Sequence, residues 1–170
     1  MSILSDKDIK KLIKEDKLII SYVNDRDIQP ASVDLHLGCA LINLDGEIFN
    51  LKEDDYLLQP NEFILGSTRE YVKIPNDLVA QVDGKSSIGR LGVLIHVTAG
   101  FIDSGFEGNI TLEIKNISNK PFLLSNDMSI CQIIFFTLSS PCLRSYGDEE
   151  LQSKYQKSKG TILSRYQYDS

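Results

Sequence analysis

The sequence predicts a mainly β fold, a sandwich or barrel with a short helix near the amino terminus. Apolar residues alternate with polar ones in short runs, turn residues separate these runs, and the runs recur at a spacing of about 8–12 residues. The chain of 170 residues suits one domain, residues 1–170. A domain of that length can bury enough surface to fold without a disulfide or a metal.

The helix is expected directly after the amino terminus. Ser5 and Asp8, three residues apart, form a capping box that satisfies backbone N–H groups of a first helical turn. Ile9, Leu12 and Ile13 then give an apolar face at helical spacing. After these residues the apolar period changes from the helical value to two.

The strand signal starts at residues 32–37, where Val33, Leu35 and Leu37 alternate with polar neighbours, as in a half-buried strand. Turn pairs such as Asp45-Gly46 separate the later runs. Further strands are expected at residues 63–64, 79–82, 93–97, 110–114, 122–124 and 130–138.

Composition excludes several classes of function. The net charge of −6 argues against a general nucleic-acid binder, which normally has a basic face. The amino terminus lacks the apolar segment of a secretory signal, and no apolar run reaches the length of a membrane-spanning helix. The sparse cysteines Cys39, Cys131 and Cys142 fit reduced thiols. We therefore expect a cytoplasmic protein that binds neither nucleic acid nor membrane.

The carboxyl-terminal stretch differs from the rest. Residues 152–168 include Lys154, three further cations and Tyr168, and they contain no acidic residue. They could form a frayed, solvated end. They could also belong to a mobile lid, residues 147–170, that brings cations to phosphate groups. The sequence leaves both alternatives open.

The strongest local signal is the segment 83–90, Asp-Gly-Lys-Ser-Ser-Ile-Gly-Arg. Glycine lets a backbone approach an anion closely, and successive N–H groups at the start of a helical turn point toward it. Serine hydroxyls, Lys85 and Arg90 add donors. A capped turn at a hairpin corner would explain the same residues. A P-loop would not, because Val79 stands where that motif requires its first glycine.

Two more segments hold candidate catalytic carboxylates. Residues 98–108 place three glycines around Asp103, as in a loop that bends around a ligand. In the strand 109–116, three aliphatic residues form one face and Glu113 lies on the other. An ordinary turn and a solvated strand face would look the same. Glu113 can be catalytic only if it lies beside the other two segments.

A zinc site of the nucleoside deaminase type is not expected. That site needs H-x-E followed by P-C-x-x-C, and neither His36 nor His96 is followed by glutamate two residues later. Pro141-Cys142 begins the second half of the motif, but Ser145 stands in place of its last cysteine. Two histidines and scattered cysteines therefore do not build a zinc site.

Taken together and in order, these segments resemble the dCTP deaminase family and its dUTPase relatives. The similar segments, which cover most of the chain, are residues 29–38, 84–92, 96–103, 108–113, 141–146 and 153–156. The resemblance implies a distorted jelly-roll or β-barrel protomer of the dUTPase-like type, assembled as a homotrimer with its sites at subunit interfaces. It also implies dCTP as substrate, Mg²⁺ carried by the substrate triphosphate, dUTP as intermediate or alternative substrate, and dTTP as a candidate inhibitor.

The resemblance also implies roles for individual residues. Glu113 would be the general acid–base that moves a proton from water to N3 and then to the departing amine. Ser86, Arg90 and the Ala99 carbonyl would hold the water and the base, and Asp103 would contact the sugar 3′-hydroxyl. Further nucleotide or phosphate contacts are implied for Lys85, Ser86, Ser87, Ile88, Gly89, Arg90, Thr111, Leu112, Gln132, Tyr146 and Lys154.

The residues after Thr98-Ala99 separate two kinds of family member. Members that only deaminate often have His-Arg there, whereas those that continue to dUMP and pyrophosphate have glycine and an aromatic residue. Gly100-Phe101 favours the bifunctional reaction, in which the smaller loop leaves room for a second water and Asp103 orients it. In the tail, Ser158 stands where the family usually has glutamine, so the sequence departs from the pattern there.

Three alternatives remain open. The chain could be a deaminase that stops at dUTP, a plain dUTP diphosphatase, or a non-catalytic nucleotide-binding β module. A dUTPase usually ends in a glycine-rich arm, and after residue 140 this chain has only Gly147 and Gly160. The products formed from dCTP in the presence of Mg²⁺ distinguish these alternatives.

Overall fold

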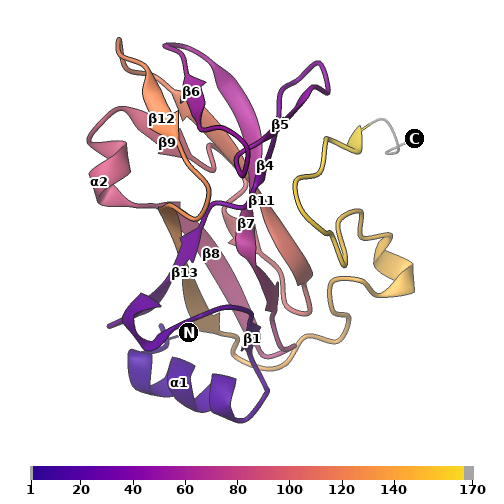
Figure 1. The fold of residues 1–170 in the computed structure, drawn as a ribbon. Helices are drawn as coiled ribbons and strands as arrows, with labels where there is room; N and C mark the ends of the chain where they lie inside the picture. Colours follow the sequence, from indigo (N-terminus) through magenta and orange to yellow (C-terminus); the bar gives the residue numbers. More distant parts are fainter. Residues whose placement is uncertain (1, 167–170) are drawn as a thin grey trace.

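The computed structural model describes residues 2–166 and has a mainly β fold built from two larger sheets and a short two-stranded one (Figure 1). The predicted fold class is confirmed. Buried side chains from both larger sheets form one apolar cluster, which includes Leu35, Leu112, Ile133 and Phe135. Residues 167–170, among them Tyr168 of the predicted lid, lie outside the described residues.

The amino-terminal helix lies where the capping signal placed it. Helix α1 spans Asp6–Lys14, and the Asp8 N–H donates to the Ser5 hydroxyl over 3.4 Å. The Ser5 hydroxyl donates in turn to the Asp8 carboxylate over 3.1 Å, where the capping box would have the carboxylate accept from the Ser5 backbone. Ile9 is fully buried, so the apolar face packs the helix onto the sheets.

The first larger sheet has the strand order β5-β4-β7-β11-β9, and β1 pairs with the other end of β7. Its strands are β1 (Ile19–Ile20), β4 (Ala40–Ile42), β5 (Ile48–Asn50), β7 (Phe63–Lys73), β9 (Val93–Ile95) and β11 (Glu107–Asn116). The antiparallel β7–β11 pair forms its centre, with Lys115 opposite Phe63 and Glu107 opposite Lys73. Strand β7 is much longer than the two residues expected. Buried and more exposed residues alternate over residues 68–73, but the buried positions include the polar Thr68 and Glu70, so the sequence shows no apolar–polar alternation there.

The second larger sheet has the order β10-β8-β13-β3-β2. Its strands are β2 (Ile28–Gln29), β3 (Ser32–His36), β8 (Leu78–Gly84), β10 (Phe101–Ile102) and β13 (Ser129–Thr137). The remaining elements are the pair β6 (Tyr56–Leu58) and β12 (Phe122–Leu124), the short helix α2 (Ser86–Gly89), and 3₁₀ turns at Asp25–Asp27 and Glu149–Leu151. None of the helices within residues 2–166 is long and apolar enough to cross a membrane.

Strand β11 alternates strictly between buried and half-buried residues. A bulge opposite Ile110 interrupts its pairing with β7. Asn109 stabilises the bulge, because its side-chain amide donates to the carbonyls of Thr68, Arg69 and Glu70 at 3.0–3.3 Å. The alternation directs Thr111 and Glu113 away from the core.

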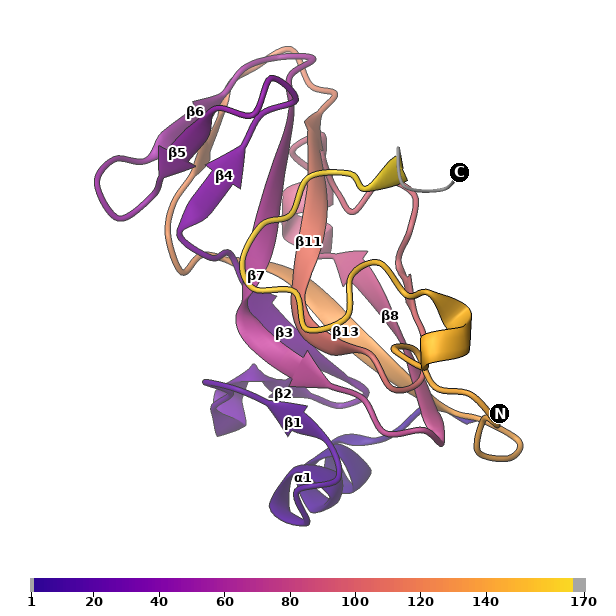
Figure 2. The ribbon, with the colours of Figure 1, turned by 90° about the vertical axis from the view of Figure 1, so that its right-hand side faces the viewer.

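The carboxyl-terminal segment crosses β11 on this outer face (Figure 2). Ser158 forms a parallel bridge with Gly108, and the Asn109 N–H donates to the Ser158 carbonyl over 2.9 Å. Further along, the Ile162 N–H donates to the Thr111 hydroxyl over 3.2 Å. Residues 157–162 are thus bonded to the sheet rather than frayed, and the opening of a lid remains a prediction.

Candidate functional site

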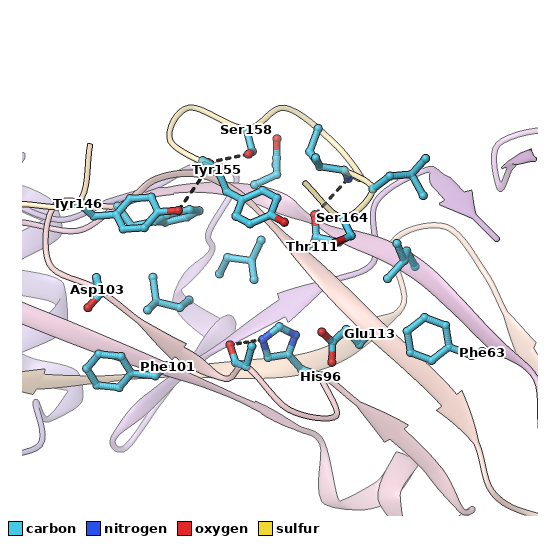
Figure 3. A pocket seen from close by; sticks show the side chains of 18 of the residues that line it. Phe63, His96, Phe101, Asp103, Thr111, Glu113, Tyr146, Tyr155, Ser158 and Ser164 are labelled. Carbon is cyan, nitrogen blue, oxygen red and sulfur yellow. Dashed lines mark hydrogen bonds between the residues drawn. The ribbon is translucent and has the colours of Figure 1, made fainter. Parts of the chain in front are cut away.

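A cavity of about 680 Å³ lies between β11, the loop that follows β9, and the carboxyl-terminal segment (Figure 3). Its wall combines aromatic and aliphatic side chains with a few polar ones, as is typical of small-molecule sites. Among the residues that line it are Phe63, His96, Ala99, Phe101, Asp103, Thr111, Glu113, Tyr146, Tyr155, Ile162, Leu163 and Ser164.

Glu113 enters the cavity from the outer face of β11. One carboxylate oxygen, Oε2, accepts from the Thr98 backbone N–H at 3.2 Å and from the Thr98 hydroxyl at 3.1 Å. Within residues 2–166, no hydrogen bond is made to the other oxygen, Oε1. The carboxylate is therefore held in place on one side and open to a ligand on the other.

The loop that carries Ala99 and Gly100 lies against the edge of β8. The Val82 N–H donates to the Gly100 carbonyl over 2.8 Å. A Cβ atom at Gly100 would lie 2.8 Å from the Val82 carbonyl oxygen, which is backbone and cannot swing aside. Only glycine fits this arrangement, so a larger residue would displace the loop. Phe101, which is 63% exposed, follows directly and lines the cavity.

Asp103 and Tyr146 lie at the far end of the same cavity (Figure 3). The Tyr155 N–H donates to the Tyr146 phenol oxygen over 3.1 Å. Burial raises the pKa of Tyr146 above its usual value, so its phenol stays protonated at neutral pH. The cavity thus offers the phenols of Tyr146 and Tyr155 and two carboxylates, Asp103 and Glu113.

Thr111 and Leu112 are adjacent in β11, and their side chains lie on opposite faces of the strand. Thr111 lines the cavity, and its hydroxyl already accepts from the Ile162 N–H. Leu112 has 0% of its surface exposed, because it points into the core between the sheets. Its side chain cannot touch a ligand in the cavity, so only its backbone could serve the nucleotide contact that the resemblance implies.

The turn at α2 forms a separate hollow. Lys85, Ser86 and Gly89 line a space of about 230 Å³ together with β9, and His96 lines both hollows. Ser87 and Arg90 are exposed, whereas the Ile88 side chain is buried in the core. Within one chain, the structure therefore does not bring Ser86 and Arg90 into the cavity of Glu113.

Lys85 and Gln132 meet polar partners on the second sheet. The Lys85 ammonium is hydrogen-bonded to the Asp34 carboxylate. Gln132 lies opposite Asp34 in the β13–β3 ladder, and its side-chain oxygen accepts from the Ser32 hydroxyl over 3.0 Å. Both residues lie outside the walls of the larger cavity.

Lys154 also lies outside those walls, and its carbonyl accepts from the Arg165 guanidinium. In the part of the chain that the structure describes, no group of three or more His, Cys, Asp or Glu side chains is placed to hold a metal ion. The absence of zinc from the reaction remains a prediction.

Sequence reasoning missed two parts of this site. Thr98, which holds the Glu113 carboxylate, belongs to the same segment as Ala99, but nothing in its local pattern distinguished it. Tyr155, Ile162 and Leu163 form the outer wall. The tail sequence suggested cations over phosphates and gave no sign that its apolar residues close a cavity.

Comparison with solved structures identifies the architecture. The chain resembles a 2′-deoxycytidine 5′-triphosphate deaminase from Agrobacterium tumefaciens with a TM-score of 0.71 and 24% identity, over 80% of this chain and 48% of that one. It resembles the dUTPase of EIAV with a TM-score of 0.55 and 21% identity, over 75% and 93% of the two chains. At such identities the likeness shows the fold, which is that of the dCTP deaminases and dUTPases.

Sequence comparison narrows this class to one family. A family model described as dCTP deaminase-like matches residues 3–44 and 40–138. Two relatives, from Methanosphaera stadtmanae and Dictyoglomus thermophilum, are 44% and 46% identical and align over 99% and 98% of this chain and 96% of their own. Both are named "dCTP deaminase, dUMP-forming", and a 40% identical relative from Haloarcula marismortui, aligned over 98% of this chain and 96% of its own, is named "dCTP deaminase". The chain belongs to the dCTP deaminase-like family.

Proposed function

We propose that this protein deaminates dCTP at C4 of cytosine without zinc and then releases pyrophosphate to give dUMP. The observation that carries the proposal is the Glu113 carboxylate, which has one oxygen held by Thr98 and the other open to a cavity that also contains Asp103. The relatives named as dUMP-forming support the same reaction.

In the first step, Glu113 takes a proton from water while the water oxygen bonds to C4. Glu113 then gives this proton to N3. It next moves the proton of the new C4 hydroxyl to the amino group, the C4–N bond breaks, and ammonia leaves. A carboxylate positioned in this way typically contributes about 10²–10⁴-fold. Ala99 lies in the same wall, and its carbonyl is an acceptor that can orient the water or the amino group.

In the second step, a water attacks the α-phosphate of the bound dUTP and pyrophosphate leaves. Asp103 is the second carboxylate of the cavity and the candidate to orient this water. Gly100 supports this step, because its lack of a side chain lets the loop that carries Ala99 and Phe101 lie close to β8. Two carboxylates in different surroundings would then serve two hydrolyses.

The site is completed by a second copy of the chain in a homotrimer. Ser86 and Arg90 are exposed on the turn at α2 and do not reach the cavity of their own chain. A cyclic assembly places one surface of each copy against a different surface of the next, so the turn of one subunit can face the Glu113 cavity of its neighbour. Lys85, Ser87, Gly89 and Gln132 would then contact the triphosphate.

Mg²⁺ would enter with the triphosphate, since Mg²⁺ is usually bound through substrate phosphates and a few carboxylates. Inhibition by dTTP, which the resemblance implies, and a cytoplasmic location, which the composition indicates, remain predictions.

Product analysis tests the reaction. Incubation of dCTP with Mg²⁺ should yield ammonia, pyrophosphate and dUMP in equal amounts, with little dUTP at any time. Stoichiometric dUTP without pyrophosphate would show a deaminase that stops after the first step. No ammonia, with turnover of dUTP, would show a plain dUTP diphosphatase, and no turnover of either would show a binding module.

Subunit mixing tests the shared site. Glu113→Gln and Arg90→Ala chains should each be inactive alone, whereas mixed trimers from co-expression should recover about a quarter of the wild-type sites. The recovered sites combine Glu113 from one chain with Arg90 from the other. Mixed trimers that stay inactive would contradict a site built between subunits.

A further inference from the structure

His96 occupies an unusual place beside Glu113. It follows β9 and lines both hollows, and its backbone N–H donates to the Glu113 backbone carbonyl over 2.8 Å. Its backbone is left-handed, with φ at 62°, a conformation that is uncommon outside glycine, although histidine enters it more often than most residues. A strained backbone at a site wall is retained only where the surrounding contacts enforce it, so the position of this side chain has a structural cause.

The His96 ring forms a hydrogen bond within its own loop. Its Nε2 atom lies 2.6 Å from the Ala99 carbonyl oxygen (Figure 3). A carbonyl can only accept, so Nε2 must carry the proton. The other ring nitrogen, Nδ1, is buried and has no hydrogen-bond partner within residues 2–166. The single polar contact of this ring therefore goes to Ala99.

The same loop holds the carboxylate. Thr98, between His96 and Ala99, donates both its N–H and its hydroxyl to Glu113 Oε2. Fixing the Ala99 carbonyl by the His96 ring thus also fixes the two donors that orient Glu113. Residues 96–99 form one small turn. At one end the His96 backbone is hydrogen-bonded to β11, and at the other end the Ala99 carbonyl is hydrogen-bonded to the His96 ring.

We propose that His96 is a positioning residue for deamination, which holds the Ala99 carbonyl through Nε2–H and thereby sets the geometry of the loop over Glu113. The proposal rests on the proposed function, because deamination is the reaction that this geometry serves. His96 itself need not touch the nucleotide.

Two amide substitutions test the hydrogen bond to Ala99 separately from the left-handed backbone. Asparagine tolerates a left-handed backbone, but its amide occupies the place of Nδ1 and does not reach Ala99. The glutamine amide can occupy the place of Nε2 and donate to the same carbonyl. We expect His96→Asn to lower kcat for ammonia release from dCTP about 10-fold or more, with KM nearly unchanged, because small misplacements of catalytic groups are costly. His96→Gln should recover most of that loss.

Wild-type kcat in His96→Asn would overturn the proposal, as would a folded His96→Gln that is no better than His96→Asn. If the left-handed backbone prevents His96→Gln from folding, His96→Gly suits that backbone. Added imidazole should then restore turnover to His96→Gly, and no response to imidazole would overturn the proposal.

A measurement without substrate separates this proposal from the proposed function. Nitrogen NMR of the unliganded protein should show the proton of the His96 ring on Nε2, and a proton on Nδ1 alone would overturn the proposal. If the wild-type protein released no ammonia from dCTP, the proposed function would fail, and the positioning role in deamination would fail with it. An active wild type with an unaffected His96→Asn would overturn only the role of His96.

Discussion

Two glutamates on neighbouring strands of one sheet, each near a histidine, have opposite surroundings. Glu70 on β7 is 1% exposed, and its carboxylate accepts from the His36 N–H at 2.8 Å and from an Arg69 guanidinium N–H at 2.7 Å. The His36 ring nitrogen Nδ1 lies 2.9 Å from the same carboxylate. Among the described residues, Glu113 on β11 has donors on one oxygen only, and it faces a cavity.

The difference shows how a sheet can use the same side chain for two purposes. A buried carboxylate with donors on both oxygens is not accessible to a substrate, and its removal leaves uncompensated partners. A carboxylate with an open oxygen can bind and move a proton. Loss of Glu70 should therefore affect folding, and loss of Glu113 should affect turnover.

The largest effect is expected at Glu113. Glu113→Gln keeps the size and most hydrogen bonding of the side chain but cannot shuttle a proton, so kcat for dCTP should fall about 10²-fold or more. Steady-state kinetics measure the fall, while nucleotide binding by calorimetry and the melting temperature should stay near wild type. More than about a tenth of wild-type turnover would place the base elsewhere.

The next largest effect is expected from the tail. Truncation after Gly147 removes Tyr155, Ile162 and Leu163 from the cavity wall and frees the Thr111 hydroxyl. We expect a folded trimer whose KM for dCTP rises about 10-fold or more, since a closing segment contributes to substrate binding. Light scattering checks the assembly. Unchanged kinetics would mean that the segment only covers a surface.

A smaller effect, on stability alone, is expected at Glu70. Glu70→Gln removes the charge between His36 and Arg69, and we expect the free energy of unfolding to fall by about 1–3 kcal/mol. Denaturant titration measures this loss. The kcat of the folded variant should match wild type, and a selective loss of kcat without a loss of stability would remove the contrast with Glu113.

Removal of transition metals is expected to have no effect on activity. A chelator selective for them, with Mg²⁺ in excess, should leave ammonia release from dCTP unchanged, because the sequence has neither half of the zinc deaminase motif complete. Loss of activity that returns on addition of zinc would contradict this prediction. The wild-type protein with added zinc alone is the control.

The sequence by itself determined much of the fold and the candidate residues. Ser5 marked the start of the first helix, and the alternation around Glu113 set it opposite the buried Leu112. The resemblance predicted that Ala99, Asp103 and Glu113 belong to one site, and these residues line one cavity. The helix start and the strand face depend on residues close together in the chain, where capping and strand period leave a local pattern. The grouping of the site residues came from the resemblance alone.

Only the tertiary structure decided which carboxylate stays open and what encloses it. Neither Glu70 nor Glu113 has a local pattern that reveals its partners, because His36 on β3 and Thr98 in the loop after β9 come from other segments. The bond from Ile162 to Thr111 joins residues 51 positions apart. Such contacts arise when distant segments pack together, and periodicity along the chain does not encode them.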